Sequence, residues 1–434
     1  MTPTVSTPVP VEQWKPVHLT ELELSAPLQP LPCDGPERYS HVSALVRLHG
    51  QPIGVLDLPT GAEPAEQARA VRRSLTPDIE HHLAGDGLTG ADRVGELAVA
   101  ASGAPACVAG RARLLADAPP VTVLVATRDR TRELGACLDS LMAQDYPGAY
   151  DVVVVDSAPA SDATMRYLQQ RFAGEERVRY VRTDVPGLAV AHNHGLPAVT
   201  GEITAITDDD VVVDTQWLSA IVGAFRATPG TACVTGLILP AELETPAQAL
   251  LEQYGGFARG FRRRVYALDA GPADDPLFPY TAGRLGSGAN MAFDTRLLRA
   301  LGGFDPALGA GTPARGGDDL AAFVQVLLAG HRLVYEPAAI IRHRHRRDYA
   351  GLLAMAQGYG VGLGAYLTSV VASRPTLIVD MARKGPQAVS YLLRADSVKN
   401  RNKGVSYPRA LTRTERIGMV RGPLAYLTSR RRSA

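Results

Sequence analysis

The most constraining feature of the sequence is a series of short, charge-free runs that alternate with helix-like segments after Pro119-Pro120. These runs are rich in β-branched residues, which is typical of strands buried on both faces. They are Val121–Ala126, Val152–Val155 and Ile203–Thr207, and a further strand pattern with two arginines is Val178–Arg182. Strands and helices in alternation, joined by short loops, predict βαβ units and therefore an α/β fold with a mostly parallel, doubly wound sheet.

Polar or acidic residues follow three of these runs at the point where each run ends. They are Thr127-Arg128-Asp129, Asp156 and Asp208-Asp209-Asp210. Open α/β sheets bind their ligands just outside the carboxyl ends of the strands. The sequence therefore predicts a binding site at this edge of the sheet.

The acidic triplet Asp208-Asp209-Asp210 is the sharpest motif. Three adjacent carboxylates repel one another, and a divalent cation would relieve that repulsion. Hard oxygen ligands suit Mg²⁺ or Mn²⁺, and such sites commonly hold substrate phosphates as well. The alternative interpretation is a polar turn at the end of a strand.

A second acidic motif is Gly316-Gly317-Asp318-Asp319, which precedes the apolar helical pattern Leu320–Leu328. One interpretation is a helix N-cap, where aspartate is favoured by backbone donors and by the helix dipole. The other is a general base that takes a proton from a hydroxyl or amine. One aspartate can cap the helix while the other faces a site.

The third motif is His343-Arg344-His345-Arg346-Arg347, which follows an apolar strand pattern. On an extended chain the two histidines point to one face and Arg344 and Arg346 to the other. A histidine there could complete a metal site, and arginines suit phosphates. The alternative is a basic surface strand.

The composition is that of a soluble globular protein with several domains. The chain has 434 residues, is 46% hydrophobic and 21% charged, and has a net charge of +1. These values exclude a collagen, a wholly disordered chain and a polytopic membrane protein, and they give no reason to expect a nucleic-acid partner. Four cysteines without a CxxC pair predict no disulfide framework and favour a reducing cytosol.

Two regions flank the predicted sheet domain. The first, residues 1–118, contains a hairpin pattern and a polar helical stretch over residues 62–84, which predicts a small α+β accessory module. No group in this region converges on any chemistry. Its first ten residues show no signal peptide, so a cytoplasmic location is expected.

The last region, residues 348–434, contains the charge-free segment Tyr349–Ser373 and a basic tail. The segment is long enough to span a membrane, but Gln357 and five glycines favour a packed or interfacial helix. Residues 394–434 carry 11 basic against 2 acidic side chains. The tail could therefore contact anionic lipid at the inner face of the membrane, and the alternative is a solvated tail. Quantitative recovery in the soluble fraction at low salt would contradict membrane contact.

Taken together, the motifs between Pro120 and Gly364 resemble those of inverting family 2 glycosyltransferases with the GT-A fold. Their specificity comes from seven elements in the family's order rather than from any single one. The elements are VTVLVATRDR, VVVVDSAP, GLAVAHNHGL, AITDDDVVVD with Trp217-Leu218, GSGANMAF with Gly303-Phe304-Asp305, GGDDL and HRHRRDY. The resemblance implies a GT-A, Rossmann-like domain over residues 119–347, an accessory module over 1–118 and a helical, basic extension over 348–434.

The resemblance also implies a donor side of the site. Thr127, Arg128 and Asp129 would border the nucleotide, and Asp156 would hold its base or ribose. Further implied donor contacts are His192, Asn193, Asp208 and the variable Asp209. The family often has Arg or Lys where this chain has His192, which leaves the role of that residue open.

On the metal and acceptor side, the resemblance assigns Asp210 to the cation. His343 would reach the metal or the diphosphate, with His345 as the alternative. Asp319 would be the catalytic base. Asp318, in place of the family's usual Glu, and Trp217 would contact the acceptor.

The function implied is that of a bacterial, Mg²⁺- or Mn²⁺-dependent inverting glycosyltransferase of the hexosyltransferase type. The donor would be a nucleotide diphosphate sugar, and the acceptor is an unidentified small molecule, lipid-linked compound or polysaccharide. One alternative is a sugar-phosphate nucleotidyltransferase, which normally has a Gly-rich basic loop where this chain has Thr127-Arg128-Asp129-Arg130. Another is a non-catalytic nucleotide-sugar-binding protein, which the full set of carboxylates disfavours.

Overall fold

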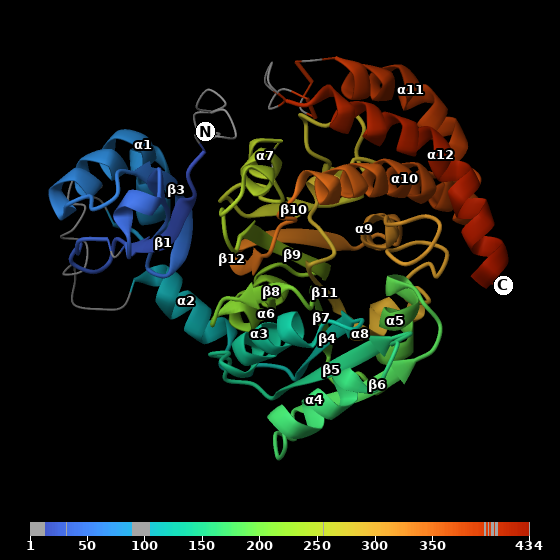
Figure 1. Cartoon of the computed structure of the whole chain (residues 1–434), viewed down its shortest axis with the longest axis horizontal. Helices are drawn as coiled ribbons and strands as arrows, with labels where there is room; N and C mark the ends of the chain where they lie inside the picture. Colours follow the sequence, from blue (N-terminus) through green and yellow to red (C-terminus); the bar gives the residue numbers. More distant parts are fainter. Residues whose placement is uncertain are drawn as a thin grey trace.

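A computed structural model describes residues 14–31, 33–88, 105–254, 256–394, 396–397, 399–400, 403 and 407–433. Its centre is a mixed sheet in which nine strands are described, in the order β10-β12-β9-β11-β7-β4-β5-β6, with β8 paired to β12 (Figure 1). The strands are β4 Val121–Thr127, β5 Tyr150–Ser157, β6 Val178–Thr183, β7 Ile203–Asp208, β8 Val211–Val213, β9 Thr231–Pro240, β10 Arg264–Tyr266, β11 Asn290–Asp294 and β12 Arg332–His343.

The predicted α/β class is confirmed: the run β7-β4-β5-β6 is parallel, and β9 and β12 form a further parallel pair. Alternate residues of these strands face two separate hydrophobic clusters. Leu124 and Val155 lie in one cluster, whereas Val123 and Val154 lie in the other. Burial on both faces explains the charge-free runs of β4, β5 and β7, whereas the edge strand β6 is only half-buried and carries two arginines. The sequence did not indicate β11, which runs antiparallel to its neighbours β7 and β9.

Helices cover both faces of the sheet. They are α3 Thr131–Met142, α4 Ala163–Arg171, α5 Leu188–Gly195, α6 Trp217–Ala227, α7 Pro246–Tyr254, α8 Thr295–Ala300 and α9 Asp318–Leu328. Leu134 and Leu138 of α3 pack with Trp217 of α6 on one face. Ala189 of α5 and Phe323 of α9 pack on the other face.

The N-terminal region forms a separate α+β unit with its own core, at the blue end of Figure 1. It contains β1 Val17–Glu23, β2 His41–Leu48, β3 Gln51–Leu58, α1 Pro64–Gly85 and α2 Ala106–Leu114. The hairpin predicted in this region is β2–β3. Leu45 of β2 packs against Leu237 and Ile340 of the central sheet, and Arg47 pairs with Asp214 at 2.5 Å.

The C-terminal region is helical, as the sequence predicted, with α10 Tyr349–Ser373, α11 Leu377–Leu393 and α12 Arg409–Ser433. The charge-free segment is α10, and it begins at Tyr349 because the Asp348 carboxylate accepts from Gly351 N–H at 2.6 Å. Within the described residues no helix combines the length and the apolar character needed to cross a bilayer. Membrane contact and the domain boundaries at residues 118 and 347 stay predictions.

The glycines of α10 serve helix packing, because α10 and α12 lie side by side (Figure 1). A Cβ atom on Gly364 would lie 2.3 Å from the Met419 carbonyl oxygen, and one on Gly360 would lie 2.0 Å from that of Glu415. The two backbones approach too closely for any side chain at these positions. The Gly-x-Gly run of α10 is therefore a helix contact.

We expect Gly364→Ala to lower the free energy of unfolding by about 1–3 kcal/mol, because the added methyl group forces α10 and α12 apart. The matched control is Gly385→Ala in α11, where a Cβ would meet no atom within 4 Å. Alanine there should be neutral or stabilising by up to about 1 kcal/mol. Chemical denaturation of the full-length chain measures both, and equal effects of the two substitutions would contradict the packing argument.

Candidate functional site

The register of three parallel strands brings the predicted polar residues together at one edge of the sheet. Thr127 at the end of β4 pairs with Asp156 at the end of β5. On the other side of β4, Ala126 pairs with Asp208 at the end of β7. The expectation that these side chains gather at the carboxyl ends of the strands is confirmed.

The side chains of the acidic triplet lie in different environments. Asp208 lines a cavity, whereas Asp209 is buried and accepts from the Thr127 hydroxyl at 2.7 Å. Arg130 donates to Asp209 at 2.7 Å and to Asp210 at 2.9 Å. Asp209 is thus held by Thr127 and Arg130, and the donor contact expected for it stays a prediction.

The pKa values of the three aspartates shift in different directions, because their charged neighbours differ. Burial, together with the neighbouring carboxylates, raises the pKa of Asp208 well above its ordinary value. Burial also raises the pKa of Asp209, to about 6, against the opposing effect of Arg130. For Asp210, the cost of burial is outweighed by His343 and Arg130, which hold its pKa below the ordinary value. The sequence analysis assigned no role to Arg130, although its place in the loop after β4 was a usable signal.

A potential cation site is formed by Asp208, Asp210 and His343, whose ligand atoms all lie within 4.8 Å of one another. Pairing of β12 with β8 sets His343 opposite Val211, and its Nε2 lies 3.3 Å from Asp210 Oδ1. Burial lowers the pKa of His343 to about 4, so the imidazole is neutral near pH 7. Two carboxylates and a neutral imidazole are suitable ligands for Mn²⁺ or Mg²⁺.

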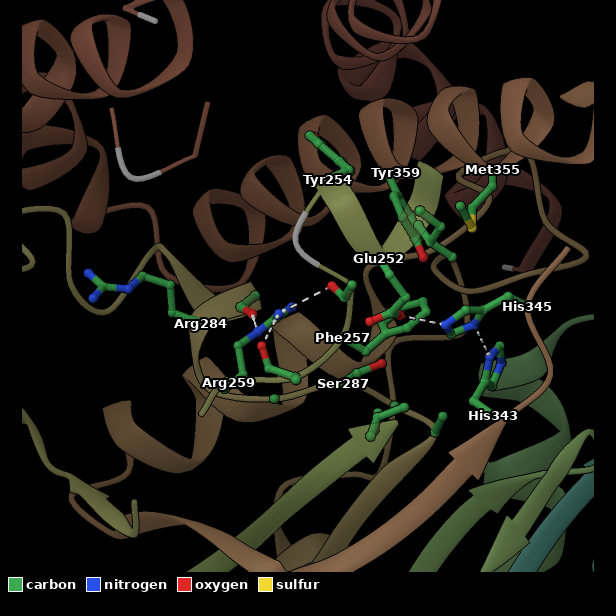
Figure 2. Close-up of a pocket in the computed structure, with 18 of the residues that line it drawn as sticks. Glu252, Tyr254, Phe257, Arg259, Arg284, Ser287, His343, His345, Met355 and Tyr359 are labelled. Carbon is green, nitrogen blue, oxygen red and sulfur yellow. Dashed lines mark hydrogen bonds and ion pairs between the residues drawn. The ribbon is translucent and has the colours of Figure 1, made fainter. Parts of the chain in front are cut away.

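Figure 2 shows how His343 is oriented by two residues behind it. His343 Nδ1 lies 3.2 Å from His345 Nδ1, and His345 Nε2 lies 2.7 Å from Glu252 Oε1. If His345 donates to Glu252, its Nδ1 accepts the Nδ1–H of His343, and the lone pair of His343 Nε2 faces Asp210. This arrangement favours His343 over His345 as the histidine on the metal side.

The second acidic pair lies at the start of α9 and lines the same cavity as Asp208. Asp319 accepts from Gly288 N–H at 2.7 Å and from Leu320 N–H at 2.8 Å. Gly288 lies just before β11, whose first residue pairs with Thr207 beside Asp208. The two acidic motifs are therefore joined through one short segment.

Burial raises the pKa of both carboxyl groups in this pair. The pKa of Asp318 rises to about 7 through burial and the neighbouring Asp319, and burial raises that of Asp319 against its two backbone hydrogen bonds.

The turn that leads into α9 packs directly on α10, since a Cβ on Gly317 would lie 2.6 Å from the Gly362 carbonyl oxygen.

The expected donor-side residues have different surroundings. Asp156 is buried, with one carboxylate oxygen 3.1 Å from the Tyr180 hydroxyl and the other without a partner among the described residues. His192 lines the cavity, and both its ring nitrogens are likewise unpartnered there. Arg128 is exposed, and Asp129 accepts from Ala160 N–H at 3.0 Å.

Two expected contact residues are occupied within the fold. Trp217 is completely buried, and its indole N–H donates to Asn290 Oδ1 at 2.9 Å. Asn193 bonds the backbone of Phe304 through both ends of its amide, at 2.7 and 2.8 Å. Their side chains are bonded within the protein, and the acceptor contact expected for Trp217 and the donor contact expected for Asn193 stay predictions.

The cavity has a volume of about 2900 Å³ and extends from Asp208 to the face of the N-terminal hairpin. Its wall beside the histidines is aromatic and basic, as Figure 2 shows. The Phe257 ring lies 5.4 Å from that of His343 and 6.4 Å from that of Tyr359, and Arg259 donates to the Gly283 carbonyl at 2.7 Å. These side chains belong to no motif in the sequence, so the sequence did not indicate their place in the cavity.

We expect Glu252→Ala to weaken Mn²⁺ binding about 10–100-fold, because His345 would lose the acceptor that fixes the orientation of His343. Glu202→Ala is the control, since Glu202 is exposed before β7, at the end of the strand opposite Asp208. Titration of free Mn²⁺ by electron paramagnetic resonance measures both variants. An unchanged affinity in Glu252→Ala would rule out this positioning role.

Sequence comparison finds curated relatives among sugar transferases. The chain is 27% identical over 262 residues to a pre-mycofactocin glycosyltransferase of Mycobacterium tuberculosis, a match that covers 57% of this chain and 50% of the relative. It is 21% identical over 257 residues to a glucosyl-dolichyl phosphate glucuronosyltransferase of Haloferax volcanii, covering 55% and 75%. The chain thus spans about half the length of the mycobacterial relative.

Among solved structures, the chain is similar to a mannosyltransferase from Pyrobaculum calidifontis in complex with GDP-Man and Mn²⁺. The TM-score is 0.43 and the identity 21%, over 72% of this chain and 73% of the other. The family model described as glycosyltransferase like family 2 matches residues 119–356, which is more than half of the 434 residues. The chain therefore belongs to this glycosyltransferase family.

Proposed function

We propose that the chain transfers a sugar, in a divalent-metal-dependent reaction with inversion, from a nucleotide diphosphate sugar to an acceptor hydroxyl or amine. The observation that carries the proposal is the convergence of two acidic groups on one cavity: Asp208 with Asp210 and His343, and Asp318 with Asp319. Family membership supports the reaction class. Peripheral membrane contact and a cytoplasmic location remain part of the proposal.

On the donor side, Asp208, Asp210 and His343 would hold the cation. When bound, the cation would neutralise charge on the leaving diphosphate. Arg346 also lines the cavity close enough to lower the pKa of Asp210, so its guanidinium could contact a phosphate. Both ring nitrogens of His192 and one carboxylate oxygen of Asp156 have no partner among the described residues, so they would offer further polar contacts to the nucleotide.

On the acceptor side, Asp319 takes the proton from the nucleophile. The acceptor oxygen or nitrogen forms a bond to the anomeric carbon while the bond from that carbon to the diphosphate oxygen breaks on the opposite face. The electron pair leaves with the diphosphate, and the configuration inverts in one displacement. The backbone N–H groups of Gly288 and Leu320 hold Asp319 in place for this step.

The acceptor would bind along the aromatic and basic wall formed by Phe257, Tyr359 and Arg259. Aromatic faces suit the apolar faces of a sugar or another ring.

The competing function, a sugar-phosphate nucleotidyltransferase, is disfavoured because the loop Thr127-Arg128-Asp129-Arg130 contains no glycine and Arg130 is engaged by Asp209 and Asp210. Release of nucleoside diphosphate, rather than formation of nucleoside triphosphate, would distinguish the two reactions.

We expect one or a few nucleotide diphosphate sugars to raise the melting temperature in the presence of Mn²⁺, because a ligand that binds only the folded state stabilises it by mass action. At a ligand concentration of 100 times Kd the gain is about 2.7 kcal/mol. A thermal-shift panel of uridine and guanosine diphosphate sugars, with and without Mn²⁺, measures it. Asp210→Asn should remove the Mn²⁺-dependent part of the shift, and a panel without any shift would oppose the proposed donor class.

We expect Asp319→Asn to lower the transfer rate by about 10²–10⁴-fold, since an amide cannot take up the acceptor proton. Donor affinity in the same thermal-shift assay should change by less than about twofold if the base does not hold the donor. Asp318→Asn is the matched comparison, because it removes the adjacent carboxylate of the same helix turn. Loss of transfer in Asp318→Asn with retention in Asp319→Asn would move the base to Asp318.

A further inference from the structure

Four side chains of the N-terminal region converge at one point, away from the cavity described above. His49 lies at the tip of the β2–β3 hairpin, His82 and Asp86 lie at the C-terminal end of α1, and Cys107 lies in the first turn of α2. His49 and Asp86 are almost completely buried, with 6% and 2% of their side chains exposed. One ligand atom from each residue lies within 4.8 Å of the other three.

The six distances between these atoms describe a small tetrahedron. His49 Nδ1 lies 2.9 Å from Asp86 Oδ2, 3.1 Å from His82 Nε2 and 3.6 Å from Cys107 Sγ. Cys107 Sγ lies 3.7 Å from His82 Nε2 and 3.1 Å from Asp86 Oδ2. His82 Nε2 and Asp86 Oδ2 lie 3.4 Å apart. Metal bonds of about 2.0–2.1 Å to nitrogen or oxygen and about 2.3 Å to sulfur give tetrahedral edges of roughly 3.3–3.6 Å.

We propose that His49, His82, Asp86 and Cys107 bind one zinc ion in a closed, tetrahedral, structural site. Two imidazoles, a thiolate and a carboxylate are the ligand types that zinc accepts, and the thiolate disfavours Mg²⁺, Ca²⁺ and Mn²⁺. The charges also balance: one thiolate and one carboxylate neutralise a divalent ion, while both imidazoles stay neutral. A site with no net charge is suited to a buried position.

The backbone around the ligands is held in a conformation that suits this role. His49 has a positive φ of 53°, which is uncommon for a residue other than glycine. Glu23 accepts from the N–H groups of His49 and Gly50, both at 3.1 Å, and so fixes the turn. Cys107 N–H donates to Asp86 Oδ1 at 2.6 Å, which leaves Oδ2 facing the centre of the four atoms. Such outer hydrogen bonds orient metal ligands.

A reactive cysteine is the main competing explanation of the cluster. Cys107 Sγ donates to the Asp86 carboxylate at 3.1 Å, and an anionic partner of this kind does not activate a thiol as a nucleophile. The surroundings therefore favour metal binding over thiol catalysis.

The ion would link the hairpin, α1 and α2, and through α2 the rest of the chain. Arg111 of α2 hydrogen-bonds Gln216 just before α6, and α2 packs on α6. Zinc thus fastens the N-terminal unit at the point where it contacts the glycosyltransferase domain. Its role is structural, and it is independent of the cation held by Asp208, Asp210 and His343.

The test is elemental analysis of the full-length chain, expressed in zinc-supplemented medium and purified without a metal-affinity tag. We expect about one zinc per chain in the unmodified protein and in Asp210→Asn. His82→Ala and Cys107→Ser should each lose the zinc. His81→Ala and Cys33→Ser are the matched controls, because His81 is an exposed neighbour on the same helix and Cys33 is another free cysteine, and both should keep it.

A second measurement avoids dependence on the folding of the variants. Cobalt(II) added to the unmodified, chelator-treated chain should give the strong visible bands of a tetrahedral site and a thiolate-to-cobalt charge-transfer band. Absence of zinc together with absence of these bands overturns the proposal. Equal zinc content in the unmodified chain and in soluble His82→Ala also overturns it.

Discussion

The alignment of β7 between β4 and β11 is the constraint on which the candidate site depends. It brings Asp208 next to the end of the parallel strand β4 and also next to the segment that holds Asp319. The cost of gathering carboxylates there is partly offset by Arg130, which donates to Asp209 and Asp210. Asp208 has no such arginine partner among the described residues and lines the cavity, which is where the proposed cation would lie.

Regions outside the family domain pack against the strands and helices that carry the candidate site. The N-terminal unit lies against the central sheet through Leu45 and the Arg47–Asp214 ion pair. On the other side, α10 contacts the turn that leads into α9. The family domain is thus supported at both ends, and the cavity extends beyond it to the face of the N-terminal hairpin.

Much of this arrangement follows from local patterns in the sequence. The buried strands, the helix over Tyr349–Ser373 and the acidic residues at the strand ends were predictable, because charge-free runs and strand ends have direct structural meaning. The orientation of Trp217 was not, because motif position does not say whether a side chain faces the core. Arg130 was missed since its partners lie about 80 residues away, at separations of 79 and 80.

The cluster of His49, His82, Asp86 and Cys107 was missed for a similar reason. The sequence analysis found no chemistry in this region, because the histidines are 33 residues apart and Asp86 and Cys107 are 21 apart, unlike any short metal motif. The His82–Asp86 pair, four residues apart on one helix, was the one local signal.

The contact of α12 with Gly360 and Gly364 has a consequence for another face of α10, where Gly362 lies. Gly362 and Tyr366 of α10 press on Gly317, next to the aspartates of α9. Helix α12 therefore supports the position of the proposed base, Asp319, through its packing on α10. Deleting α12 would therefore loosen the packing of α10 on the turn that leads into α9.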